Sequence, residues 1–196
     1  MWAQSTTHAS LLQRVAAGAD PAAWDEFHGR YRDLIRGFAQ RRGLQPADCD
    51  DVVQDVLLAL TQAMRRFEYQ PEKGRFRAYL KATTQRLVHR KIWHKQGGAA
   101  LELVGSPEQF ATPDPAAEDA WETEWRAYHV RQAMRTIEVE FNRADLRAFQ
   151  WYVVEGRDAQ ETAAALSLTV NQVYQAKSRI VKRLAALIAA QAEDEG

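Results

Sequence analysis

Residues 48–64 of this 196-residue chain read DCDDVVQDVLLALTQAM, and this stretch decides the fold class. Its apolar residues recur every three or four positions, which predicts an amphipathic helix with one buried face. That face comprises Val52, Val53, Val56, Leu57, Leu60 and Met64. Acidic residues crowd the first turns, where they suit the positive end of the helix dipole. On the opposite face, Asp51, Asp55, Leu58 and Gln62 form a mostly polar stripe, which we will call the Asp51–Gln62 stripe, that can dock a partner helix.

The segments on both sides show the same helical spacing. Asp20 followed by Pro21 predicts a helix start, and Gly43 predicts its end. A further helix is expected to run to about His94, with Phe76, Leu80, Thr83 and Leu87 on one face. Strand-like alternation is absent. We therefore predict an all-α fold.

Two glycines at 97–98 and the stretch SPEQFATPDP at 106–115 predict a linker, after which helical spacing resumes near Ala117. A short helix over 158–166, a turn at 167–169 with Thr169 as N-cap, and a longer helix from Val170 then follow. We expect a first domain over residues 1–95, an acidic linker over 96–124 and a second domain over 125–190. The second domain contains a helix-turn-helix.

The charge is balanced overall but not along the chain. Lys and Arg number 26, as do Asp and Glu, yet residues 65–95 carry ten basic and two acidic side chains, whereas 96–126 carry one basic and seven acidic. Aromatic residues are interleaved with the cations, a pattern typical of single-stranded nucleic-acid binding. The alternative is a solvated helix face with Phe76 in the core.

The last long helix offers a second nucleic-acid surface. Amide and guanidinium groups suit base edges in a major groove, and lysines suit phosphates. The exposed face is expected to present Asn171, Gln172, Gln175, Ser178, Arg179, Lys182 and Arg183, while Val173, Ala176, Ile180, Leu184 and Leu187 pack inward. An ordinary helical hairpin with a polar outer face is the alternative.

Other classes of protein find no support in the sequence. The single Cys49 excludes an internal disulfide framework, and no apolar run is long enough to span a membrane. The N-terminus does not read as a signal peptide. A Gly-rich phosphate loop, metal-ligand spacing and a nucleophile elbow are all absent. We expect no enzyme, no cofactor, no metal and no membrane insertion, and a cytoplasmic location.

Two segments resemble the sigma-70 family of RNA polymerase sigma factors. Asp48–Leu58 resembles its D-A-E-D-x-x-Q-x-x-F/L signature, and Glu155–Leu184 resembles its region 4. With only these two regions in about 200 residues, the chain resembles the extracytoplasmic-function group. The family pattern has alanine at Cys49, glycine at Ser167, and often basic or small residues at Tyr174 and Gln175, so promoter preference does not transfer. The resemblance implies an alternative sigma factor that directs promoter-specific initiation.

The resemblance also implies roles for individual residues and for partners. Region 2 would contact the β′ clamp helices of core RNA polymerase through Asp51, Gln54, Asp55 and Leu58. It would melt and read the −10 promoter element through Phe67, Tyr69, Arg75, Arg77, Lys81, Thr84, Gln85, Arg86 and Arg90. Region 4 would pack on the β flap and read the −35 element through Asn171, Gln172, Gln175, Lys177, Ser178, Arg179, Lys182 and Arg183. An anti-sigma factor or other regulator is a further expected partner.

A helix-turn-helix regulator that works without polymerase is the alternative function. It predicts self-association and palindromic DNA sites. It leaves the Asp51–Gln62 stripe and the basic, aromatic block unexplained.

Overall fold

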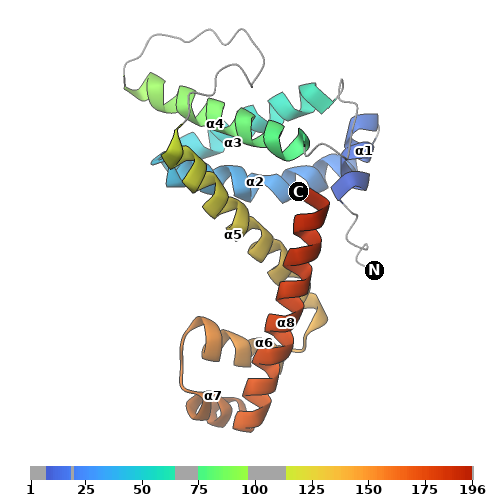
Figure 1. Cartoon of the computed structure of the whole chain (residues 1–196), viewed down its shortest axis with the longest axis vertical. Coiled ribbons are helices and arrows are strands. Elements are labelled where there is room, and N and C mark those ends of the chain that lie inside the picture. Colours follow the sequence, from blue (N-terminus) through green and yellow to red (C-terminus); the bar gives the residue numbers. More distant parts are fainter. Residues whose placement is uncertain (1–7, 19, 65–74, 97–113, 196) are drawn as a thin grey trace. The chain divides into compact units, whose positions relative to one another are not determined.

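A computed structural model describes residues 8–18, 20–64, 75–96 and 114–195. Regular structure in these residues is entirely helical, which confirms the all-α prediction (Figure 1). The chain divides into two compact units, one comprising Met1–Arg126 with Asp194–Gly196 and the other comprising Ala127–Glu193. None of the helices in the described ranges combines the length and apolarity needed to cross a bilayer.

In its described residues, the first unit is built from four helices and the beginning of a fifth. These are α1 (His8–Ala17), α2 (Pro21–Arg41), α3 (Pro46–Met64), α4 (Arg75–Lys95) and the first part of α5 (Pro115–Glu140). The predicted start of α2 is confirmed, because the Asp20 carboxylate accepts a hydrogen bond from the Ala23 N–H at 3.1 Å and Pro21 occupies the first helical position. Gly43, with a φ of 85°, lies just after the end of α2.

The core of the first unit joins α2 to α3 and α4, which lie side by side in Figure 1. The apolar face predicted for α3 is buried from Val52 to Leu60, while the side chain of Met64 lies outside the described part. Phe76, at the start of α4, is also buried, with its ring centroid 5.8 Å from Phe27 and 5.3 Å from Tyr31. This aromatic cluster fixes the N-terminal end of α4 on α2.

Helix α5 begins inside the segment expected to be the acidic linker. Asp114 accepts hydrogen bonds from the backbone N–H groups of Ala116 and Ala117, and Pro115 takes the first helical position. Together these two residues start a helix as Asp20 and Pro21 do in α2. Residues 115–124 are therefore helical, and residues 97–113 lie outside the described part.

The second unit contains the remaining helices. After the last turns of α5 come α6 (Arg143–Phe149), the π-helical segment η3 (Gln150–Val154), α7 (Ala159–Leu166) and α8 (Val170–Glu195). Its core consists of two clusters, one with Ala148, Ala163, Val173 and Ala176, the other with Ile137, Phe149 and Ile180. The inward face predicted for α8 is thereby confirmed, with Leu184 and Leu187 partly buried beside it. The π-helical segment was not anticipated from the spacing.

The turn between α7 and α8 places Ser167 in the left-handed conformation, at φ 55° and ψ 40°. Serine thus adopts, at this position, a backbone conformation that favours glycine. Ser167→Gly should raise the free energy of unfolding by about 1 kcal/mol, because glycine adopts this conformation without steric cost. Ser178→Gly, in the middle of α8, should instead lower it by roughly 0.5 kcal/mol. Urea unfolding measures both, and a loss of stability in Ser167→Gly would contradict this account.

Candidate nucleic-acid interface

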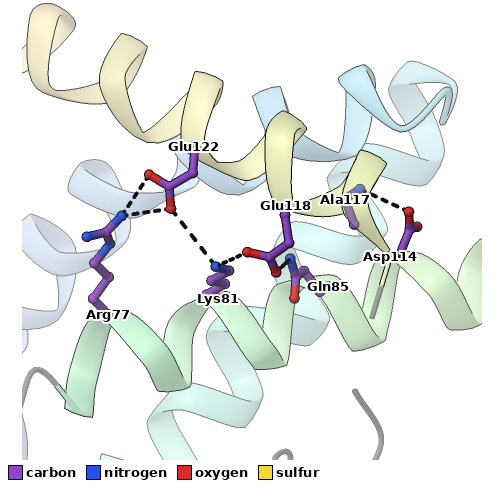
Figure 2. Close-up of polar contacts among 7 residues, drawn as sticks. All are labelled: Arg77, Lys81, Gln85, Asp114, Ala117, Glu118 and Glu122. Carbon is purple, nitrogen blue, oxygen red and sulfur yellow. Dashed lines mark hydrogen bonds and ion pairs between the residues drawn. The ribbon is translucent and has the colours of Figure 1, made fainter. Parts of the chain in front are cut away.

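The basic helix α4 presents a row of polar side chains to the first turns of α5. Arg77, Lys81 and Gln85 are spaced four residues apart and so lie on one face of the helix. The Arg77 guanidinium donates to both carboxylate oxygens of Glu122, at 2.9 and 3.0 Å. Lys81 and Gln85 both donate to the carboxylate of Glu118 (Figure 2). We call these three residues the Arg77–Gln85 face.

The charges on the two helices are complementary. The hydrogen bond from the Lys81 ammonium is the main reason that the pKa of the Glu118 carboxyl lies below its usual range, although burial acts in the opposite direction. Glu118 is therefore ionised at neutral pH. Lys81 also lies 4.0 Å from Glu122, so one ammonium is shared between two carboxylates.

The other residues expected at the −10 element do not share this face. Thr84 is fully buried, and its hydroxyl donates to the Leu80 carbonyl oxygen at 2.8 Å, so the structure removes it from any DNA-contacting surface. Packing covers it because it lies at the edge of the apolar face of α4. Arg86 is half-buried, and Arg90 pairs with Asp55 on α3.

Three members of the expected −10 set cannot be placed. Phe67 and Tyr69 lie outside the described residues, and Arg75 begins α4 without a described side chain.

The acidic helix α3 forms a ladder of ion pairs with the end of α4. Asp51 pairs with Lys91 and Asp55 with Arg90, each at 2.7 Å. Asp48 pairs with Lys95 and Lys91, and the hydrogen bond from Lys95 is the main reason that its pKa is lowered. The sequence interpretation missed this ladder. The matching spacing of acids in 48–55 and bases in 90–95 is the signal that could have revealed it.

The Asp51–Gln62 stripe nevertheless faces solvent. Asp51 and Asp55 are exposed, as is Gln54 on the border of the stripe. Leu58 is 58% exposed, more than any other leucine that the structure describes. Leu58 is thus a single exposed apolar side chain among the carboxylates and amides of α3.

In the second unit, every residue expected at the −35 element is exposed on α8. Three of them pair within the unit: Arg179 with Asp145 at 2.8 Å, Arg183 with Glu140, and Lys177 with the ring of Tyr152. Gln172 is engaged at the helix start, where it accepts from the Thr169 N–H at 2.7 Å and donates its own N–H to the Thr169 hydroxyl. This capping box confirms Thr169 as the N-cap.

The remaining four, Asn171, Gln175, Ser178 and Lys182, lie along the exposed surface of α8. They are the side chains best placed to reach base edges or phosphates, because the other four are already engaged in contacts within the unit.

Comparison with known proteins finds a similarity over part of the first unit. Residues 27–96 match the family model of sigma-70 region 2. The solved structure of CnrH in complex with the cytosolic domain of CnrY is 18% identical to the chain, covering 94% of this chain and 99% of that one, with a TM-score of 0.38. A search of curated proteins finds no match.

The matched segment, residues 27–96, contains both of the first unit's candidate surfaces. It contains the Asp51–Gln62 stripe on α3 and the Arg77–Gln85 face on α4. The carboxylates that cover the Arg77–Gln85 face come from α5, beyond the matched segment. Among the residues with described positions, no group of three His, Cys, Asp or Glu side chains could hold a metal ion.

Proposed function

We propose that the chain is an alternative sigma factor of the extracytoplasmic-function group. It would bind core RNA polymerase, direct promoter-specific initiation in the cytoplasm, and do so without catalysis or a cofactor of its own. The observation that carries this proposal is the region 2 match over residues 27–96, with an exposed Leu58 among the carboxylates of α3. The α7–α8 hairpin of the second unit supports it as a second DNA-binding element.

The Asp51–Gln62 stripe is the proposed polymerase contact. Asp51, Gln54, Asp55 and Leu58 would meet the β′ clamp helices, with Leu58 buried on docking and the acids at its rim. Lys91 and Arg90 hold the two carboxylates in place in the free protein. The carboxylates of the stripe are therefore already ordered before polymerase binds, which lowers the entropic cost of binding.

DNA recognition would be divided between the two units. The Arg77–Gln85 face, with Arg86 and Arg90 further along α4, would contact the −10 element. The exposed residues of α8 would read the −35 element, and this unit would also pack on the β flap. An anti-sigma factor or other regulator is a further proposed partner.

Transcription in vitro tests the proposal. Core polymerase would be supplied with and without the protein, over a fragment library of the host genome. New start sites that share motifs near −35 and −10 are the expected result. Duplex DNA binding to palindromic sites, with no new transcripts, would replace the proposal with the regulator that works without polymerase.

Leu58→Ala separates docking from folding. Because Leu58 is exposed, its truncation should change the free energy of unfolding by less than about 0.5 kcal/mol. Loss of an apolar anchor at the centre of an interface should weaken polymerase association by about tenfold or more. Val139→Ala, which truncates an exposed valine of the second unit, is the comparison. Equal binding of wild type and Leu58→Ala would exclude Leu58 from the interface.

A further inference from the structure

We propose that the first turns of α5, residues 114–126, are a built-in competitor that covers the DNA-binding face of α4 in the free protein. This inference rests on the proposed function, because it assigns a control to the α4 surface named there. DNA would have to displace these turns before it could reach the Arg77–Gln85 face.

The contacts on that face are those that a nucleic acid would make. Glu118 and Glu122 lie one turn apart on α5, and the groups they bind lie one turn apart on α4 (Figure 2). One nitrogen of the Arg77 guanidinium, Nη2, donates to both carboxylate oxygens of Glu122, and phosphate oxygens can accept the same charge-assisted hydrogen bonds. An ammonium shared by two carboxylates is equally suited to a polyanion. Glu118 and Glu122 thus bind the cationic groups of α4 through the same kind of charge-assisted hydrogen bond that phosphates would make.

Aromatic packing anchors these turns of α5. Trp121 is fully buried with its ring edge-on to Phe38 of α2, at 5.6 Å between centroids. Trp125 stacks near Trp121 and also lies under the guanidinium of Arg77, 4.8 Å from the ring centroid. Arg77 is therefore held from two directions, by a carboxylate and by an indole. Docking of α5 removes this side chain from DNA more completely than an ion pair alone.

A third glutamate of α5, Glu124, packs against α2 at Gly37. The side chain of Glu124 is only 4% exposed and binds the Arg41 guanidinium at 2.7 Å. Its carboxylate fits against Gly37, where an added Cβ would lie 2.3 Å from the nearest oxygen. Arg42 binds Asp114 at 2.6 Å, just before the helix. The Glu124 carboxylate thus occupies space that a side chain at residue 37 would take.

The contact between residues 114–126 of α5 and helix α4 has features of a reversible one. The carboxylates that meet α4 are half-exposed, so salt and competing polyanions weaken these pairs. The buried indole N–H of Trp121 finds no acceptor among the described residues, and an unsatisfied buried donor opposes docking. DNA, with many phosphates, can therefore replace two glutamates.

Neutralising the two glutamates in the full-length protein tests the inference. The probe is a fluorescein-labelled, random-sequence, single-stranded DNA oligonucleotide, and fluorescence anisotropy reports its binding. Glu118→Gln with Glu122→Gln should bind about tenfold tighter than wild type, because phosphates no longer compete with carboxylates for Arg77 and Lys81. The salt dependence should steepen by about 1.4 in slope, which corresponds to two phosphate contacts on single-stranded DNA.

A matched pair controls for net charge. Asp119→Asn with Glu138→Gln removes the same two charges from exposed positions of the same helix. This control should leave the salt slope at the wild-type value.

A second variant releases α5 without changing any charge. Gly37→Ala places a methyl group where the Glu124 carboxylate lies, so the carboxylate must move aside and its ion pair with Arg41 should weaken, whereas Gly29→Ala adds the same methyl to open space on α2. Gly37→Ala should raise hydrogen exchange in the peptide 114–126 and tighten DNA binding, and Gly29→Ala should do neither. Unchanged DNA affinity in both the Glu118, Glu122 variant and Gly37→Ala, or an equal gain in both controls, would overturn the inference.

The transcription assay keeps this inference separate from the proposed function. Suppose that the variants bind DNA more tightly and that no variant yields transcripts. This result would support competition by residues 114–126 and reject the sigma-factor function. Transcripts from the wild type, with no gain in DNA affinity in the variants, would support the sigma-factor function and reject competition by residues 114–126.

Discussion

Replacing both Asp51 and Asp55 with lysine is expected to abolish association with core RNA polymerase. Both carboxylates are exposed on the face of α3 that also carries Leu58. A surface that docks through acidic groups meets a complementary partner, and reversing two of its charges places like charges together at a cost of several kcal/mol. We expect association to fall by at least about a hundredfold, where tenfold corresponds to 1.4 kcal/mol.

The fold should survive this double substitution. The ion pairs of Asp51 with Lys91 and of Asp55 with Arg90 are solvent-exposed, and such pairs contribute about 0–1 kcal/mol each. Thermal melting followed by circular dichroism checks this point, and co-purification with core polymerase measures the binding. Asp25→Lys with Asp119→Lys reverses two exposed charges away from α3 and should bind normally. Co-purification of the Asp51, Asp55 variant at the wild-type level would remove this stripe from the interface.

Phe27→Ala should give the largest loss of stability among the substitutions considered. Phe27 is fully buried, and its ring centroid lies 4.9 Å from that of Tyr31 and 5.8 Å from that of Phe76. Truncating a buried phenylalanine costs about 3–5 kcal/mol through lost burial and the cavity that remains. That loss is a large fraction of the roughly 5–15 kcal/mol by which domains are stable.

Urea unfolding measures this effect, and Leu58→Ala serves as its comparison. The two residues differ in burial and not in apolar character, so a large loss in one and none in the other reports packing. Because Phe76 starts α4, weaker packing at residue 27 should also raise hydrogen exchange at the N-terminal end of α4. A loss below about 1 kcal/mol would show that the cluster collapses around the missing ring.

The helices could be predicted from the sequence because their causes are local. The apolar spacing of α3 survives in the fold as a buried face from Val52 to Leu60. Asp20 with Pro21 starts α2, and Thr169 with Gln172 starts α8, through hydrogen bonds within one turn. Phe76 is buried, as its place on the apolar face of α4 suggests. The Asp51–Gln62 stripe is exposed because the opposite side of the same helix is the apolar one.

Only the tertiary structure decided which charges meet. Arg77 and Glu122 are 45 residues apart in the chain, and Gly37 and Glu124 are further apart still. The charge sums show a basic segment and an acidic one, but ion pairs form between them because Trp121 packs on Phe38 and brings α5 to α4. Thr84 is hidden for a related reason, since its burial depends on the helices around α4 and not on its own type. Periodicity and caps act within a few residues, whereas these contacts depend on the packing of distant segments.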